Sequence, residues 1–346
     1  MLVGIHKEPY GKFSEFLKKY EKILDYNGLN HIRLDASQAD FWEKVKTLDL
    51  FIFRWKHFDT ERQIAHTIVP VIEREIGIKC FPDWKTCWHY DDKIKEYYLL
   101  KQHGFPAIES YIFWEKKAAL DWLKTAEFPV VFKLKGGAGS TNVILVKTKK
   151  HAKRLIARMF GKGILPERFF DRSAVRFKHF NLYKEVHHLG GNILRKVRGE
   201  DISSFWQLHK NYVLFQKFLP NNDYDTRVAV IGNRASAFRR YVRENDFRAS
   251  GSKNLNMDRS KIDLEFVKIG LDISKRLGFQ SMAYDFIYDD EKPALIEISY
   301  TYPDEHAFST GYWDSDFKWH EGRFWPQYFQ LMDALGLPDL KQPSME

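Results

Sequence analysis

Two segments near the C-terminal end decide the fold: Tyr284-Asp285-Phe286-Ile287 and Ala294-Leu295-Ile296-Glu297-Ile298-Ser299. Each reads as an apolar strand that carries one acid, and the charged turn between them predicts a β-hairpin. Because alternate side chains of a strand share a face, Asp285 and Glu297 can converge on one point. Two such carboxylates suit a hard cation such as Mg²⁺. Two ordinary strands with solvent-facing acids are the alternative.

The composition of the 346-residue chain fits a globular protein of two or three lobes. Hydrophobic residues make up 44% and aromatic residues 16%, which argues against disorder. We expect no membrane span and no signal peptide, because apolar runs are short and the start of the chain is soon charged. With two cysteines a disulfide framework is excluded, so a cytoplasmic location is expected. The net charge of +9 predicts an anionic partner.

The order of strand and helix signals predicts an α/β (α+β) protein of three domains. Residues 1–90 alternate strands and helices and predict a small α/β domain. Residues 91–208 contain the strongest strand, Phe128 to Leu134, and predict a central lobe. Residues 209–346 are rich in strands and carry the acidic hairpin, which predicts a C-terminal lobe. Within the central lobe, residues 161–208 lack a clear period and are interpreted as an insertion.

A glycine-rich loop follows the strongest strand. Gly136, Gly137 and Gly139 carry no side chain, so backbone N–H groups there can approach phosphate oxygens closely. Ser140 and Thr141 add hydroxyl donors. The loop matches neither a Walker loop nor a dinucleotide fingerprint. Taken alone, it also fits a flexible hairpin turn.

Two lysines stand where a phosphate would suit them. Lys133 lies within an apolar strand, and a buried lysine needs an anionic partner. Lys93 opens the helix that follows Asp91-Asp92. On its own, Lys93 is typical of a solvated surface lysine.

A strand end at residues 216–219 predicts a hinge that contacts a nucleotide base. Gln216, Lys217, Phe218 and Leu219 precede an Asn-rich turn and Asp225. Backbone groups at such a hinge can bind adenine beside an apolar wall, and a nearby acid can bind ribose hydroxyls. A plain strand end with a turn is the alternative.

Four arginines lie between this hinge and the acidic hairpin: Arg239, Arg240, Arg243 and Arg248. The planar guanidinium group matches the geometry of carboxylates and phosphates, so the cluster predicts stabilisation of a phosphoryl group. A nucleic-acid patch is the rival interpretation. It is disfavoured because the segment belongs to no known nucleic-acid-binding module.

In this order, the segments over residues 85–303 resemble the ATP-grasp superfamily. The closest resemblance is to the branch of ribosomal-protein glutamate ligases and glutathione synthetase, whose motifs look like Asp225-Thr226-Arg227, Arg239-Arg240 and Asp246-Phe247-Arg248. The resemblance implies an ATP-grasp fold, in which two α+β lobes hold ATP behind an N-terminal α/β domain. Ser299, Ser250 and Lys135 depart from the usual residues of the family.

The resemblance also implies a role for each motif. ATP would be bound by Lys93, Lys133, the loop from Gly136 to Thr141, the hinge from Gln216 to Leu219, and Asp225. Asp285, Glu297 and Ser299 would bind one or two Mg²⁺ ions, with Mn²⁺ as a substitute. Because Ser299 replaces the usual asparagine, the second ion is in question. Arg227, Arg240 and Arg248 would be catalytic, and Arg240 and Arg248 would face the acyl phosphate.

The activity implied by the resemblance is an ATP-dependent carboxylate–amine ligase that forms an amide through an acyl phosphate. The carboxylate could belong to a small molecule, a peptide or a surface-polysaccharide sugar acid, and the acceptor would be an amine. A homodimer is common among such enzymes. A small-molecule kinase on the same fold and a non-catalytic nucleotide- or nucleic-acid-binding protein are the alternatives.

Overall fold

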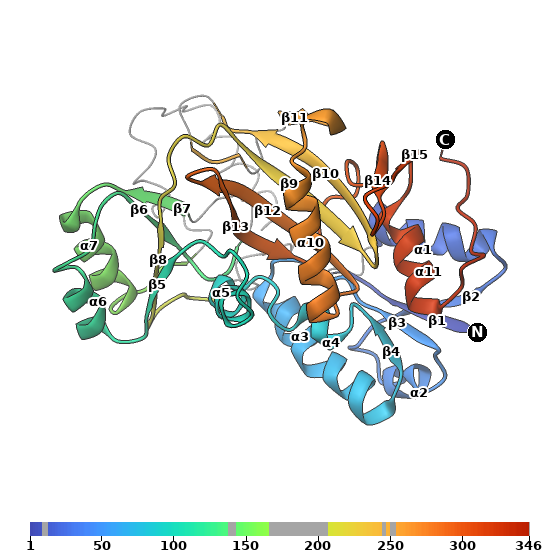
Figure 1. Cartoon of the computed structure of the whole chain (residues 1–346). Helices are drawn as coiled ribbons and strands as arrows, with labels where there is room; N and C mark the ends of the chain where they lie inside the picture. Colours follow the sequence, from blue (N-terminus) through green and yellow to red (C-terminus); the bar gives the residue numbers. More distant parts are fainter. Residues whose placement is uncertain (9–12, 138–142, 166–206, 244–246, 250–253, 346) are drawn as a thin grey trace, which may run out of the picture. The chain divides into compact units, whose positions relative to one another are not determined.

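The computed structural model describes residues 1–8, 13–137, 143–165, 207–243, 247–249 and 254–345 (Figure 1). The chain divides into two compact units. Unit 1 contains Met1–Lys56, Glu61–Ala107 and Leu219–Glu346, and unit 2 contains His57–Thr60 and Ile108–Phe218. The chain therefore crosses between units after Lys56, Thr60, Ala107 and Phe218, and the last of these crossings lies within the predicted hinge. The predicted division into three domains stays a prediction.

The N-terminal part of unit 1 is a parallel sheet between helices. Its elements, with the first turn of α3 in unit 2, are β1 (Leu2–His6), α1 (Glu15–Tyr26), β2 (Asn30–Leu34), α2 (Phe41–Val45), β3 (Leu50–Ile52), α3 (Asp59–Pro70), η2 (Val71–Ile76), β4 (Lys79–Phe81), α4 (Trp84–Cys87) and α5 (Lys93–Gln102). The strand order is β2-β1-β3-β4, and every neighbouring pair is parallel. The predicted alternation of strands and helices over residues 1–90 is confirmed.

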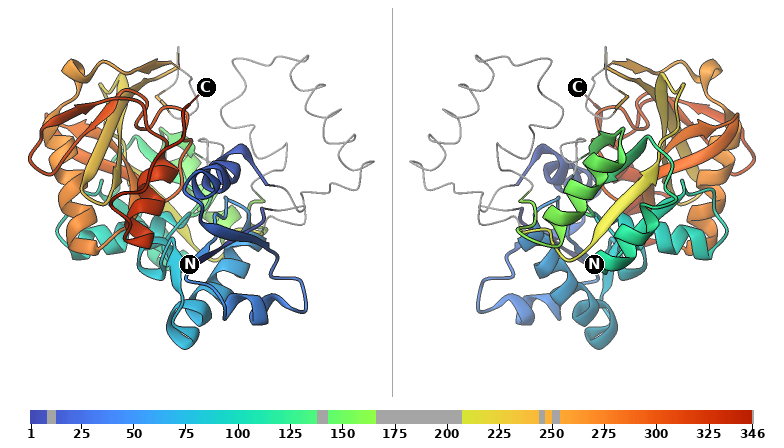
Figure 2. Two further views of the ribbon diagram at one scale, coloured as in Figure 1. Left: turned by 90° about the vertical axis from the view of Figure 1, so that its right-hand side faces the viewer. Right: turned by 90° about the vertical axis from the view of Figure 1, so that its left-hand side faces the viewer.

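Alternation along β1 and β3 sends side chains to opposite faces of this sheet. Val3 and Ile5 pack with Leu50 and Ile52 against α1 and against α11 (Pro326–Leu335), which lie side by side (Figure 2). Phe51 instead packs on the other face with residues of α2 and α3. Because both faces are covered by helices, the sheet is buried between two layers.

The C-terminal part of unit 1 is an antiparallel sheet with helix α10 (Leu264–Leu277) on one face and part of α11 on the other. Its elements are β9 (Tyr224–Ile231), β10 (Arg234–Tyr241), β11 (Leu255–Asn256), η5 (Arg259–Lys261), α10 (Leu264–Leu277), β12 (Ser281–Asp289), β13 (Lys292–Ser299), β14 (Gly311–Trp313), β15 (Trp319–Glu321) and α11. Within the described residues the strand order is β13-β12-β9-β10-β14-β15, and β11 pairs with β10.

Helix α10 buries its apolar stripe on one face of this sheet. Phe266, Val267 and Ile273 pack against Val228 and Tyr284 of the strands. The helix ends at Gly278, whose φ of +67° is readily adopted by glycine. The odd-numbered positions of β9 and β12 therefore point to the face opposite α10, and these include the charged residues of the candidate site.

The described residues of unit 2 form a smaller antiparallel sheet with two helices. Its described elements are β5 (Ser110–Phe113), α6 (Lys116–Trp122), β6 (Val130–Lys133), β7 (Val143–Val146), α7 (Lys149–Met159) and β8 (Val213–Lys217). The strand order is β5-β8-β6-β7. Most of the segment interpreted as an insertion, residues 161–208, lies outside the described residues.

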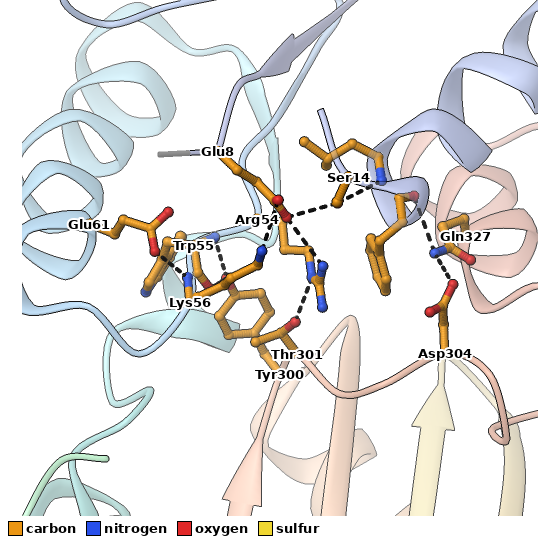
Figure 3. A network of polar contacts seen from close by, with 12 residues as sticks. Glu8, Ser14, Arg54, Trp55, Lys56, Glu61, Tyr300, Thr301, Asp304 and Gln327 are labelled. Atoms are coloured by element: carbon orange, nitrogen blue, oxygen red, sulfur yellow. Dashed lines mark hydrogen bonds and ion pairs between the residues drawn. The ribbon is translucent and has the colours of Figure 1, made fainter. Parts of the chain in front are cut away.

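A buried polar seam in unit 1 joins the parallel sheet to the end of β13. The Tyr300 hydroxyl accepts a hydrogen bond from the Trp55 N–H at 2.9 Å and donates one to the Trp55 carbonyl at 2.9 Å. The two rings pack with centroids 4.9 Å apart. One hydroxyl therefore satisfies both backbone groups of a residue that is 0% exposed (Figure 3).

Replacing Tyr300 with phenylalanine should destabilise unit 1. The change leaves the Trp55 N–H and carbonyl buried without partners, which we expect to cost about 2–4 kcal/mol. Calorimetric melting of Tyr300→Phe beside wild type measures this loss. Tyr26→Phe is the matched control because Tyr26 is 58% exposed. Equal melting temperatures for Tyr300→Phe and Tyr26→Phe would show that the Tyr300 hydrogen bonds do not stabilise the fold.

Candidate active site

The two acids of the predicted hairpin lie side by side. Strands β12 and β13 pair so that Asp285 stands directly opposite Glu297, with a β-bulge immediately after this pair. Directly opposite residues of an antiparallel pair share a face, with Cβ atoms about 5 Å apart. The predicted hairpin and the convergence of its two acids are thus seen in the structure, on the face opposite α10.

Four charged side chains of alternating sign run across strands β12, β9 and β10. Arg227 makes a bidentate ion pair with Asp285, with Nε–Oδ1 and Nη2–Oδ2 distances of 2.7 and 2.8 Å. Arg240 does the same with Asp225 at 2.6 and 2.7 Å, and also reaches Asp285 at 2.7 Å. Register explains the pairing, because Asp285 stands opposite Arg227 and Arg240 stands opposite Asp225. We call these four residues the charge chain.

The charge chain is buried, so its pairing fixes ionisation. The side chains of Asp285 and Arg240 are 9% and 8% exposed. Burial alone would raise the pKa of the Asp285 carboxyl, but the guanidinium groups of Arg227 and Arg240 hold that pKa well below its usual range. Asp285 is therefore an anion across the physiological pH range. Removing one partner of a buried ion pair lowers stability strongly, because the other charge is left buried without a counter-charge.

Glu297 extends this cluster toward helix α5. The Lys93 ammonium lies 3.0 Å from a Glu297 carboxylate oxygen, and Lys93 is the more buried partner, 9% against 32% exposed. Burial disfavours the charged form of Lys93, but the carboxylates of Glu297 and Asp91 more than compensate and raise its pKa. The predicted phosphate-binding lysine and a predicted metal-binding acid are thus direct neighbours.

Glu96 is a buried acid that the sequence analysis missed. It lies one helical turn after Lys93 on α5, and one oxygen accepts a hydrogen bond from the Ile298 N–H at 3.3 Å. Its other oxygen is buried without a partner in the described part of the chain. Burial, and then the charge of Glu297, raise the pKa of Glu96 well above its usual value. The i, i+3 spacing from Lys93 was the available signal.

Asp285 and Glu297, which we call the acidic pair, are too few to form a complete metal site from protein ligands. They suit one cation that is also bound by phosphate oxygens. Within the described ranges, no three His, Cys, Asp or Glu side chains gather closely enough to hold a metal ion. The oxygens of Asp285 already accept contacts from two guanidinium groups, whereas Glu297 is a third exposed. Mg²⁺ is commonly held by one or two carboxylates plus substrate phosphates. Glu297 is therefore the more available ligand.

Ser299 lies on the same strand as Glu297, two residues further on. Its hydroxyl donates a hydrogen bond to the Thr301 carbonyl at 2.6 Å. The hydroxyl oxygen keeps lone pairs for a cation, but this bond orients it along the chain toward Thr301. Its role as a third metal ligand stays a prediction.

Unit 2 carries the predicted phosphate-binding segment. Lys133 ends β6 and is 6% exposed. Gly136 is buried, and Gly137 has a φ of +104°, a conformation that favours glycine. The Lys135 N–H donates to the Tyr212 hydroxyl at 3.0 Å, which anchors the start of the loop. The remaining residues of the loop, Gly139, Ser140 and Thr141, lie outside the described residues.

The predicted hinge is seen at the end of β8. Gln216 is buried opposite Ser110 and donates to its hydroxyl at 3.3 Å. The Lys217 N–H donates to the Glu109 carbonyl at 2.9 Å, so this donor is already used inside unit 2 and is not available to a base. Phe218 ends unit 2, and Leu219 begins the next part of unit 1. Adenine binding by these residues stays a prediction.

Two of the three predicted catalytic arginines belong to the charge chain. Arg227 and Arg240 bind the carboxylates of Asp225 and Asp285, so in this arrangement they position acids. Arg248 lies beside the ring of Phe247, 6.0 Å from its centroid. A contact of these arginines with an acyl phosphate stays a prediction. Ser250 and Asp246 lie outside the described residues.

Comparison with known proteins identifies the family. A model of the RimK-like ATP-grasp domain matches residues 192–308, the part that carries the charge chain and the acidic pair. The α-aminoadipate–LysW ligase LysX of Saccharolobus solfataricus is 21% identical over 252 residues, covering 72% of this chain and 73% of that protein. Residues 192–308 match the RimK-like ATP-grasp domain, and the predicted resemblance to the ATP-grasp superfamily is confirmed. The predicted branch, RimK-like and similar to glutathione synthetase, is likewise confirmed.

Solved structures agree with an ATP-grasp fold. D-cycloserine synthetase DcsG matches with a TM-score of 0.56 at 13% identity, over 99% of this chain and 100% of that one. A RimK domain protein from Sphaerobacter thermophilus matches with a TM-score of 0.51 at 12% identity, over 86% of this chain and 90% of that one. At these identities the likeness concerns the fold. The predicted fold class is confirmed, and so is the expectation of an ATP-binding enzyme of the ATP-grasp ligase group.

Substitutions of Asp225 and Arg240 in the charge chain should have non-additive effects on the free energy of unfolding. Arg240→Met leaves the buried Asp225 carboxylate without its guanidinium partner and leaves Asp285 with Arg227 alone, whereas Asp225→Asn leaves Arg240 with one carboxylate. We expect Arg240→Met to lower the free energy of unfolding by about 3–5 kcal/mol and Asp225→Asn to lower it by less. The double variant should lose clearly less than the sum, because each change removes the other's unpaired charge. Thermal melting of the single and double variants measures this coupling.

A surface pair supplies the control for that cycle. Asp121 and Lys124 form an exposed ion pair, with side chains 50% and 74% exposed. Asp121→Asn should therefore change stability by less than about 0.5 kcal/mol. Strictly additive losses for Asp225→Asn and Arg240→Met would show that the two residues do not interact.

The buried acid Glu96 should make stability depend on pH. Its pKa is raised in the folded protein, so folding retains a proton that the unfolded chain releases above its ordinary pKa. Its contribution to stability is thus present at low pH and is lost as the pH rises. Glu96→Gln cannot ionise. Its melting temperature, relative to that of wild type, should therefore be higher at pH 8 than at pH 5. The exposed Glu115→Gln should follow wild type at both pH values, and a parallel course for Glu96→Gln would exclude the effect.

Proposed function

We propose that this protein is an ATP-dependent carboxylate–amine ligase that forms an amide through an acyl phosphate. The observation that carries the proposal is the acidic pair Asp285 and Glu297, flanked by the charge chain, within the segment that matches the RimK-like ATP-grasp domain. Relatives in this superfamily include a ligase, LysX, and a synthetase, DcsG, which support the reaction class.

The reaction consists of two transfers. A carboxylate oxygen of the substrate attacks the γ-phosphorus of ATP, and the bond to the bridging oxygen breaks to release ADP. The amine nitrogen then attacks the acyl carbon, the carbon–oxygen bond to phosphate breaks, and the nitrogen loses a proton as the amide forms. Both steps move negative charge onto phosphoryl oxygens, so positioning and charge neutralisation supply most of the catalysis.

The residues of unit 1 would divide this work. Glu297 and Asp285 would hold one Mg²⁺ beside the phosphates, and when bound the ion would neutralise phosphoryl charge and orient the γ-phosphate. Arg227 and Arg240 keep Asp285 ionised and fixed on the sheet. Lys93 pairs with Glu297 at 3.0 Å and would contact a phosphate oxygen of ATP. A second ion at Ser299 is not required by this scheme.

Unit 2 would contribute the remaining contacts to ATP. Lys133 and the loop that begins at Gly136 and Gly137 would bind phosphates, and the hinge at Gln216, Lys217 and Phe218 would hold the base. Among the described residues every helix is too short or too polar to cross a lipid bilayer. The identity of the carboxylate, a homodimer and a cytoplasmic location stay predictions.

Substituting the acidic pair should abolish Mg²⁺-dependent ADP release. Glu297→Gln removes the more available ligand while leaving its size unchanged, so we expect at least a hundredfold loss. Glu291→Gln is the matched control, because Glu291 is an exposed acid in the turn of the same hairpin. Chelation by EDTA should stop the wild type, and Mn²⁺ should restore it. Full activity of Glu297→Gln would refute the metal assignment.

The fate of the phosphate separates the ligase from its alternatives. Purified protein with MgATP is offered pooled carboxylic acids with and without pooled amines. A ligase releases ADP and free phosphate only when both pools are present. Phosphate that stays on a hydroxyl product would indicate a kinase, and ATP binding without acceptor-dependent ADP release would indicate a non-catalytic nucleotide-binding protein.

A further inference from the structure

Helix α7 of unit 2 and the residues that flank it present a face of positive charge (Figure 1). Residues 147–162 contain seven Lys and Arg residues and no Asp or Glu. All seven are exposed, and together we call them the basic face: Lys147, Lys149, Lys150, Lys153, Arg154, Arg158 and Lys162. The buried residues of α7 form an apolar stripe on the opposite side of the helix, and they are Ala152, Leu155, Ile156 and Met159. The basic face therefore points away from the core of unit 2.

The positive charge of the chain is concentrated in unit 2. Its main segment, residues 108–218, contains 22 Lys and Arg residues against 9 Asp and Glu residues. The whole chain contains 55 against 46, so the remaining residues carry slightly more acid than base. The net charge of +9, which predicts an anionic partner, therefore comes from this segment.

Several exposed lysines elsewhere in the chain stand beside an acid three residues earlier. Lys18, Lys46 and Lys268 lie 2.7, 2.8 and 3.6 Å from such a carboxylate. The three lysines of α7 have no acid at this spacing, and they make no ion pair with any residue of the described ranges. The surface of α7 thus differs from an ordinary solvated helix face of this protein.

The charges of α7 also conflict with the helix that carries them. Lys149 and Lys153, and likewise Lys150 and Arg154, are like charges at i, i+4 spacing, which destabilises a helix. Lys149 and Lys150 stand in the first turn, directly after the N-cap Thr148, where the helix dipole favours anions. Sequences break such local rules mainly at functional sites. An anionic partner would relieve both conflicts, because it would neutralise the cations.

The composition of the basic face favours lipid head groups over nucleic acid. Five of its seven cations are lysines, whose ammonium is a compact point charge, whereas the planar arginine fork is the usual group for nucleic acid. Residues 147–162 also contain no Asn, Gln or Ser that could read base edges. A helix that carries several Lys and Arg residues on one face is typical of binding to anionic phospholipids.

An exposed tryptophan lies near the C-terminal end of α7. Trp114 is 55% exposed, and its ring centroid is 6.0 Å from that of Tyr212. The residue before Tyr212, Asn211, donates its backbone N–H at 2.9 Å to the carbonyl of Met159, the last residue of α7. Tryptophan is enriched at membrane surfaces, where its ring lies at the level of the head groups. Trp114 therefore supplies an apolar contact beside the basic face.

We propose that the basic face of α7, together with Trp114, binds the surface of a membrane that contains anionic phospholipids. The apolar stripe of α7 stays buried in unit 2, so the helix would lie on the head groups and would not enter the hydrocarbon layer. The inference concerns residues of unit 2 other than those assigned to ATP, and it does not depend on the proposed ligase activity.

Cosedimentation with lipid vesicles tests this surface. The purified protein is mixed with vesicles of phosphatidylcholine alone or of phosphatidylcholine with phosphatidylglycerol. We expect binding to the anionic vesicles only, and release at about 1 M salt, where the screening length falls to about 3 Å. The triple variant Lys149→Gln, Lys150→Gln and Lys153→Gln should bind about a hundredfold more weakly, because each cation near an anionic surface raises affinity roughly fivefold.

Two further variants keep the test specific. The control changes Lys18, Lys46 and Lys268 to Gln, which removes three exposed cations from unit 1 and leaves α7 intact. It should bind the anionic vesicles like wild type. Trp114→Ala should weaken binding severalfold, because it removes the apolar contact. Melting curves show that every variant is folded.

The outcomes decide whether the basic face binds lipid. Binding to anionic vesicles that the α7 triple variant loses and the control variant keeps would support the inference. No binding by wild type, equal binding to phosphatidylcholine alone, or an α7 triple variant that binds as well as the control would overturn it. Duplex RNA that displaces the protein from the vesicles at equal phosphate concentration would assign the basic face to nucleic acid instead.

Discussion

The charge chain Asp225–Arg240–Asp285–Arg227 is the constraint on which the rest of the site depends. Asp225, Arg240 and Asp285 are buried and the side chain of Arg227 is 15% exposed, so each charge depends on a neighbour of opposite sign. The pairs form because strands β9, β10 and β12 meet in one register. A slip of one residue would turn these charges toward α10 and its apolar contacts. The same register that pairs the charges therefore places Asp285 opposite Glu297.

The proposed function rests on the contrast between the two acids of the hairpin. Asp285 is enclosed by arginines, whereas Glu297 is a third exposed and holds only the Lys93 ammonium among the contacts that the structure gives it. One acid is thus fixed and the other can exchange its partner. That arrangement suits a site where a cation arrives with its nucleotide and leaves with the product.

Much of this molecule could be predicted where the signal is local. The acids of the hairpin follow from apolar alternation around a charged turn, and α10 follows from apolar spacing that ends at Gly278. The pairing of Arg227 and Arg240 with acids was not predicted, because it depends on which strands become neighbours. Glu96 was missed for the same reason. Its partner, Ile298, lies about two hundred residues away in sequence.

The central claim is that phosphate activates a carboxylate before the amide forms. The most direct measurement follows oxygen from an ¹⁸O-labelled carboxylate pool into inorganic phosphate by ³¹P NMR during turnover with amines. We predict one ¹⁸O atom in each phosphate released, because the carboxylate oxygen that attacks ATP leaves with the phosphoryl group. Phosphate without label, released while amide forms, would contradict it.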